Sequence, residues 1–220
     1  MKKSKLLKAL TVLTTGALLM GMIVGCGNGQ SQEASSKGTD KQYIVMGTNA
    51  EFEPFEYREG TEIVGFDVEI AQAIAEKLGK ELKIEDMEFA SLLAQLDAGS
   101  VDFVAAGMTI NEKRLKQVDF SDSYFISKQV IIVKEEDESI KKAEDLKGKS
   151  VGVQLGTTGE EVVSKEKDIK CVPFDKGTLA VMDLVNGKVE AVVIDEEPAK
   201  RMVEAQKGIK ILEVPFIEEK

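Results

Sequence analysis

Two stretches of this sequence follow the same order of residue types. Residues 96–104 (LDAGSVDFV) and 184–192 (LVNGKVEAV) each contain the end of a helix pattern, a glycine, and a strand pattern whose second residue is acidic. The same offset places Asp195 opposite Gly107, each after a predicted strand. Open α/β sheets bind ligands at the carboxyl ends of their strands. The repeat therefore predicts two α/β lobes that share a cleft, although so short a repeat also arises by chance.

The segment around the first repeat contains candidate binding residues. Residues 101–106 are short, apolar and rich in β-branched side chains, as in a buried strand. Gly107 lets the backbone approach a ligand, and Thr109 and Asn111 are candidate N-caps for a short helix that contains Arg114. A carbonyl, a hydroxyl and a guanidinium at one strand end suit an α-amino acid, because arginine holds carboxylates through two parallel hydrogen bonds. The alternative is a solvated surface arginine.

The N-terminus has the pattern of an export signal. Residues 1–25 begin with lysines, continue as an apolar run and end before Cys26. The alternative is a membrane-spanning helix, but the apolar run is short for one, because a span needs about 20 apolar residues. The sequence IVGC at 23–26 resembles a bacterial lipobox, in which the cysteine is acylated and becomes the new N-terminus. We expect a signal peptide over 1–25, a lipid on Cys26 and a flexible linker over 26–40, with the protein anchored at the extracytoplasmic face of the membrane.

The composition excludes several kinds of site. The chain has no histidine, which rules out Ser-His-Asp triads and histidine-based metal sites. The formal net charge of −10 disfavours binding to nucleic acid. Cys171 has no disulfide partner if Cys26 carries lipid, and no dinucleotide-binding or P-loop motif is present. We therefore expect no cofactor and no bound metal ion.

Hydrophobic periodicity predicts alternating strands and helices. We expect strands over 43–48, 82–87, 101–106, 129–133, 151–154, 171–174, 189–194 and 209–215, and helices over 67–78, 92–98, 143–146 and 178–185, with further helices that begin near 156 and 198. In the first helix Asp67 is a plausible N-cap. One apolar face, which we interpret as core, is formed by Phe66, Ile70, Ile74 and Leu78 together with Ala71 and Ala75. Ser91 is the expected cap of the second helix.

Several motifs resemble those of one protein family in order and spacing. They are GFDVEIAQAIAEKL (65–78), AAGMTINEKR (105–114), DFSDSYF (119–125), GVQLGTTGEE (152–161) and AVVIDEEPA (191–199). They are similar to motifs of the family 3 extracellular solute-binding proteins, lipoproteins among them, which serve ABC importers of polar amino acids. The resemblance implies a two-lobed α/β fold of the type II periplasmic-binding-protein class. Lobe 1 would span 41–128, lobe 2 would span 129–212 and a second crossing would span 213–220, with the C-terminal end of lobe 1 apparently missing.

The resemblance also implies how a ligand carboxylate would be held. Arg114 would clamp the α-carboxylate of an amino acid, helped by the backbone near Thr109, Thr157 and Thr158. Those two threonines lie where a helix is expected to begin, and the free N–H groups of a helix start attract anions. A helix that is simply well capped is the alternative reading of that motif.

The remaining ligand contacts follow from the same resemblance. Asp195 would bind the α-ammonium, with the Gly107 carbonyl and the Thr109 hydroxyl as further acceptors. Phe52 and Phe89 would pack on the stem of the ligand side chain. The implied function is the binding of a polar L-amino acid between the lobes and its delivery to the permease subunits of an ABC importer.

Two questions stay open at the level of sequence. Asn49 and Gln154 lie where related proteins read the end of the ligand side chain, and both are neutral, which favours an uncharged polar ligand such as glutamine. Glu51 or Glu53 would add negative charge if turned inward. Some periplasmic dehydratases resemble this fold, so an enzyme that uses Glu51 or Glu53 as general acid or base is the alternative function.

Overall fold

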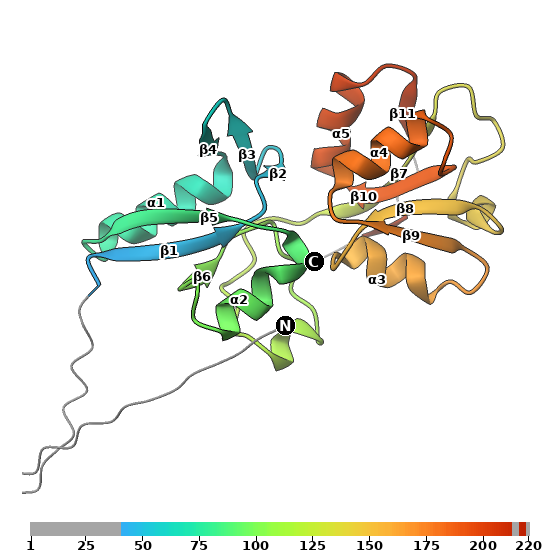
Figure 1. Cartoon of the computed structure of the whole chain (residues 1–220). Coiled ribbons are helices and arrows are strands. Elements are labelled where there is room, and N and C mark those ends of the chain that lie inside the picture. Colours follow the sequence, from blue (N-terminus) through green and yellow to red (C-terminus); the bar gives the residue numbers. More distant parts are fainter. Residues whose placement is uncertain (1–40, 213–215, 219–220) are drawn as a thin grey trace, which may run out of the picture. The chain divides into compact units, whose positions relative to one another are not determined.

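The computed structural model describes residues 41–212 and 216–218 (Figure 1). The expected signal peptide, Cys26 and the linker lie outside the described residues, as does part of 213–220. The described residues fall within one unit that spans Thr39–Lys220. They form three sheets.

The first sheet has the parallel order β5-β1-β6, with β1 (Tyr43–Thr48) between β5 (Glu81–Asp86) and β6 (Phe103–Val104). Two helices, α1 (Phe66–Lys77) and α2 (Leu92–Asp97), contact this sheet, and α2 follows the 3₁₀ turn η1 (Phe89–Ser91). A small antiparallel sheet of β2 (Glu51–Phe52), β3 (Glu56–Glu59) and β4 (Glu62–Val64) connects β1 to α1. A further 3₁₀ turn, η2 (Arg114–Lys116), follows β6.

The second sheet has the order β11-β7-β10-β8-β9, with β12 (Ile217–Glu218) beside β7. The strands are β7 (Lys128–Lys134), β8 (Ser150–Gln154), β9 (Lys170–Phe174), β10 (Ala191–Asp195) and β11 (Ile209–Ile211). The helices are α3 (Thr158–Lys165), α4 (Gly177–Val185) and α5 (Glu196–Ala205), with the 3₁₀ turn η3 (Ala143–Leu146).

Strand alternation in β7 and β10 separates the two faces of the second sheet. Val130 and Ile132 belong to a core cluster with residues of α4 and α5, whereas Ile131 and Val133 belong to a second cluster with Val163 of α3 and with η3. Because successive strand side chains point to opposite faces, one apolar strand fills both cores. Helices α4 and α5 lie on one side of β7 and β10, and α3 lies on the other (Figure 1).

The acidic residue in each copy of the sequence repeat accepts a backbone hydrogen bond. The Asp102 carboxylate accepts a hydrogen bond from the Val45 N–H (2.8 Å), and the Glu190 carboxylate accepts one from the Ser150 N–H (2.9 Å). Each acid therefore satisfies a backbone donor near the start of a neighbouring strand. These backbone hydrogen bonds are the main reason that the pKa of both carboxyls lies below its usual range.

We expect Glu190→Gln to lower the free energy of unfolding at pH 7 by about 1 kcal/mol, because a charged acceptor is replaced by a neutral one. A carboxyl whose pKa is depressed in the folded state stabilises the fold above the unfolded pKa, and this contribution is lost as pH falls through the folded pKa. The difference between Glu190→Gln and wild type should thus shrink below about pH 4. Urea titrations at pH 7 and pH 3 measure it, with exposed Glu136→Gln as the control.

Three predictions about local structure were wrong. Only two residues of 101–106 form a regular strand, because the Asp102 side chain accepts the Val45 N–H in place of a backbone carbonyl. Neither Asp67 nor Ser91 caps a helix through its side chain: α1 has Gly65 at the N-cap, and α2 continues from η1. Near Arg114 the chain forms a 3₁₀ turn, in which Asn111, and not Thr109, accepts the Arg114 N–H (2.8 Å).

The predicted apolar face of α1 is buried only in part. The helix buries Ala71 and Ala75, while Phe66, Ile74 and Leu78 are 46, 39 and 55% exposed. The helix packs on the sheet through its small residues, and in the part of the chain that the structure describes the larger apolar side chains stay accessible.

Candidate functional site

A small cavity brings together all of the predicted ligand-binding residues except Asn49. It is lined by Phe52, Phe89, Gly107, Thr109, Arg114, Gln154, Thr157, Thr158 and Asp195. Gln154 and Asp195 are the last residues of β8 and β10. The other lining residues belong to the elements and connections that follow β1, β5, β6 and β8. The strand ends of the first and second sheets therefore contribute to the same cavity, as the sequence repeat predicted.

Arg114 is buried at the cavity wall. Its Nη1 donates to the Thr109 carbonyl (2.6 Å) and its Nη2 donates to the Gly156 carbonyl (3.0 Å). The guanidinium carbon lies 5.5 Å from the centre of the Phe89 ring, within range of a cation–π contact. These contacts hold a permanently charged, flat group in one orientation, which is the geometry that carboxylate recognition needs.

The N-terminus of α3 lies at the same cavity. The Thr157 hydroxyl accepts the Glu160 N–H (3.3 Å) and donates to the Gln154 carbonyl (2.7 Å). Thr158, the first residue of α3, lines the cavity. The helix is thus capped by Thr157, and its positive end also adds to the field that an anion in the cavity would experience.

Asp195 is buried at the carboxyl end of β10. Its Oδ1 accepts from the Ser127 hydroxyl (2.7 Å) and its Oδ2 accepts from the Gln129 amide Nε2 (2.9 Å). Sequence reasoning missed Ser127 and Gln129, because only the antiparallel register of β7 and β10 places Gln129 opposite Asp195.

Gly107 and Phe52 are in close contact at the wall of the cavity. Gly107 has a φ of 53°, and a Cβ at this position would lie 3.2 Å from atoms of the Phe52 ring. A side chain at Gly107 would therefore adopt a strained backbone and crowd the aromatic ring. This explains why a glycine occupies this position in the segment after β6.

The two neutral amides predicted to read the ligand side chain bind each other. Gln154 Nε2 donates to Asn49 Oδ1 (2.9 Å), and Asn49 Nδ2 donates to the Met87 carbonyl (2.9 Å). Glu51 is paired with Lys176, and Glu53 lies 3.4 Å from Arg201 Nε. Neither glutamate lines the cavity.

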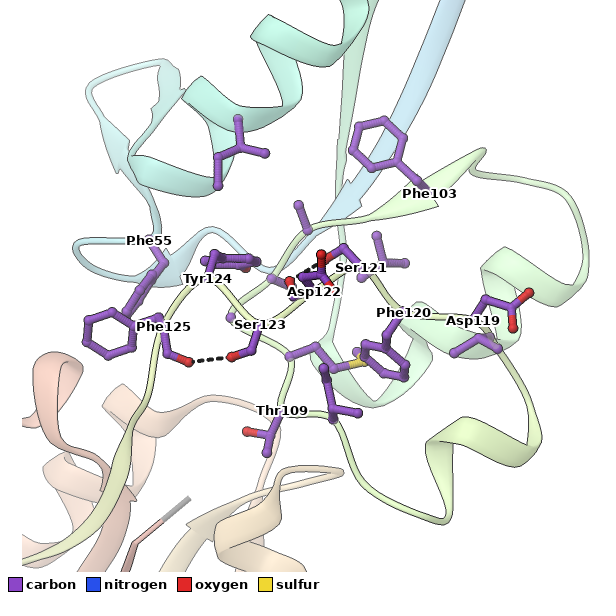
Figure 2. Close-up of a pocket in the computed structure, with 18 of the residues that line it drawn as sticks. Phe55, Phe103, Thr109, Asp119, Phe120, Ser121, Asp122, Ser123, Tyr124 and Phe125 are labelled. Atoms are coloured by element: carbon purple, nitrogen blue, oxygen red, sulfur yellow. Dashed lines mark hydrogen bonds between the residues drawn. The ribbon is translucent and has the colours of Figure 1, made fainter. Parts of the chain in front are cut away.

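A larger apolar groove of about 400 Å³ adjoins the cavity and shares Phe52, Gly107, Thr109 and Asp195 with it. Figure 2 shows this groove with Phe55 and Phe125 at one side and Phe103 at another; the rings of Phe55 and Phe125 meet edge to face with centres 5.0 Å apart. The segment 119–125 forms much of its wall.

Within 41–212 and 216–218, no group of three or more His, Cys, Asp or Glu side chains could hold a metal ion. No helix in that part of the chain is long and apolar enough to cross a membrane.

Residues 44–202 match the family model of the bacterial extracellular solute-binding proteins, family 3. The chain belongs to this family. It is similar to the arginine-binding extracellular protein ArtP of Bacillus subtilis, with 39% identity over 86% of this chain and 74% of that protein. It is also similar to the L-cystine-binding protein TcyJ of Escherichia coli, with 32% identity over 89% of this chain and 74% of that protein.

Solved structures of family relatives share the fold. Holo ArgBP from T. maritima superposes with a TM-score of 0.78 at 44% identity, over 81% of this chain and 80% of that one. The L-arginine-bound substrate-binding protein AbpA of Streptococcus pneumoniae gives a TM-score of 0.78 at 33% identity, over 81% of this chain and 78% of that one. The two-lobed type II periplasmic-binding-protein fold expected from the sequence is thereby confirmed.

Proposed function

We propose that this family member binds a polar L-amino acid in the cavity and delivers it to the permease subunits of an ABC importer. The observation that carries the proposal is the placement of Arg114 and Asp195 around one cavity, with opposite charges contributed by different sheets. An α-amino acid carries the complementary pair of charges. Relatives at 39 and 32% identity bear the names arginine-binding and L-cystine-binding protein.

The proposed mechanism is closure of lobe 1 (41–128) and lobe 2 (129–212) on the ligand. The ligand carboxylate would bind the Arg114 guanidinium and the N-terminus of α3, and the ligand ammonium would form an ion pair with Asp195. Since each lobe contributes part of the site, the ligand has higher affinity for the closed state and shifts the equilibrium towards it. The closed state is then the form that the importer recognises.

Two classes of ligand side chain have support. The buried Asn49–Gln154 pair offers neutral amide groups, which suits an uncharged polar ligand such as L-glutamine. The names and ligands of several relatives favour L-arginine. These two amino acids differ in charge at the end of the side chain and therefore discriminate between the classes.

A thermal-shift screen of the common L-amino acids, with L-arginine and L-glutamine as the main comparison, tests the proposal. A ligand at 100 times its Kd stabilises the folded state by about 2.7 kcal/mol, which corresponds to a rise in Tm of several degrees for a chain of this size. D-enantiomers are the control, because they cannot place carboxylate, ammonium and side chain together. If no L-amino acid raises the Tm, the proposed function is wrong.

The enzyme alternative has less support. An acid–base mechanism requires a carboxyl group positioned at the substrate, whereas Glu51 and Glu53 form ion pairs with Lys176 and Arg201 and do not line the cavity. The named relatives are binding proteins. Incubation with prephenate or arogenate, followed by assay for turnover, distinguishes the two functions.

We further propose that lipid on Cys26 anchors the protein outside the cytoplasmic membrane, with residues 27–40 as the linker. Cys26→Ala should leave the protein unprocessed or released, because stable anchoring needs acyl chains on that cysteine. Cys171→Ala is the matched control and should stay with the membrane fraction. Fractionation of the producing cells measures both variants, and wild-type protein found mainly in the soluble fraction would contradict the anchor.

A further inference from the structure

A buried acidic cluster lies directly behind the cavity residue Gly107. Asp67, in the first turn of α1, is fully buried, and Glu56, the first residue of β3, is 1% exposed. Asp67 Oδ2 accepts the Gly107 N–H (2.8 Å) and the Tyr124 hydroxyl (2.9 Å). One carboxylate thus joins α1, the strand end at Gly107 and the 119–125 segment.

The other carboxyl oxygens of this cluster are buried side by side, without a donor in the part of the chain that the structure describes. Among the described residues, Oδ1 of Asp67 and both carboxyl oxygens of Glu56 have no hydrogen-bond donor when both acids are written as carboxylates. Burial raises the pKa of Glu56 well above its usual range, and the facing Asp67 and the nearby Asp195 raise it further. A raised pKa favours the protonated form of Glu56, whose hydroxyl can donate a hydrogen bond to the facing Asp67.

We propose that Asp67 is a positioning residue of the binding site, which holds the backbone at Gly107 in place against the cavity. This inference rests on the proposed function. A carboxylate accepts a backbone N–H more strongly than a neutral oxygen does, and Gly107 has a backbone conformation that other residues rarely adopt. Without the carboxylate, the strand end at Gly107 is free to shift relative to Phe52 and Asp195, with which it lines the cavity.

Two variants test this role, with L-arginine and L-glutamine as probes. Asp67→Ala removes the acceptor and should weaken binding about tenfold or more. Asp67→Asn keeps an oxygen of the same shape without the charge, so the loss should be about threefold. Titration calorimetry measures both, at a temperature at which circular dichroism shows each variant folded.

The amide resonance of Gly107 in the ligand-free protein gives a direct readout. A hydrogen bond to a carboxylate moves the amide proton downfield, so it should move upfield in Asp67→Asn and further in Asp67→Ala. A purely structural role would lower stability without moving this resonance selectively. Glu190→Gln is the matched control: it also removes a carboxylate that accepts a backbone N–H, but it should leave Gly107 and the affinity unchanged.

The possible outcomes separate the inference from the proposed function. Wild type that binds no L-amino acid in the screen contradicts the proposed function, and the Gly107 resonance still tests the hydrogen bond to Asp67. A folded Asp67→Ala variant with wild-type affinity and an unmoved Gly107 resonance overturns the inference while the function stands. If Asp67→Ala does not fold, the same result in Asp67→Asn overturns it.

Discussion

Replacement of Arg114 by alanine is expected to lower the affinity for the amino acid by about 2–5 kcal/mol, the range measured when one partner of a buried charge pair is removed. In fold-change this is about 30- to 5,000-fold. The guanidinium is buried and held by the Thr109 and Gly156 carbonyls, so water cannot easily replace it beside the ligand carboxylate. Arg114→Lys should recover only part of the loss, because an ammonium lacks the flat two-pronged geometry.

Asp195→Ala should weaken binding to a similar degree, because the ligand ammonium loses its charged partner while Ser127 and Gln129 lose their acceptor. Asp195→Asn tests whether charge or shape matters more. Titration calorimetry on all four variants measures the effects, with exposed Lys116→Ala as the control for charge removal near η2. If Arg114→Ala and Asp195→Ala are both folded and bind as tightly as wild type, the assignment of the site is wrong.

The second large effect concerns stability and pH. Glu56 has a pKa that burial and the facing Asp67 raise in the folded state, so the folded protein binds a proton that the unfolded chain releases above about pH 4.3. The contribution of this group is complete below that pH and is lost as pH rises through the folded pKa. Wild-type stability should therefore fall with increasing pH, by at most about 1.4 kcal/mol per pH unit from this group.

Glu56→Gln removes that dependence, because the amide has the shape of the protonated acid and can donate to Asp67 without losing a proton. We expect the variant to show a flatter stability profile than wild type between pH 5 and pH 9, and to be the more stable protein at pH 8. Denaturant unfolding across this range measures the difference. Glu59→Gln, an exposed acid on the same strand, is the control. Parallel pH profiles for Glu56→Gln and wild type would contradict a buried protonated Glu56.

Local sequence patterns predicted much of the fold, and the family resemblance added most residues of the candidate site. The strand over Tyr43–Thr48 has the predicted bounds, and Thr157 caps α3 as a threonine before acidic residues should. Gly107 and Arg114, which follow β6, and Asp195, which ends β10, line one cavity, because ligands bind at the carboxyl ends of strands. These features depend on neighbours in the chain, which the sequence displays directly.

Only the tertiary structure decided the features that depend on distant partners. The sequence predicted Asp67 as a helix cap, yet its side chain accepts hydrogen bonds from Gly107 and Tyr124, far along the chain. Gln129 meets Asp195 through the register of two antiparallel strands, which no local pattern encodes. Which part of the apolar face of α1 is buried depends on the elements that pack against it. Periodicity therefore predicted the apolar face, but it did not predict that Ala71 and Ala75 are buried while Phe66 and Leu78 are exposed. The physical reason is the same in each case: the free energy of a buried polar or apolar group depends on the groups that surround it in the folded chain.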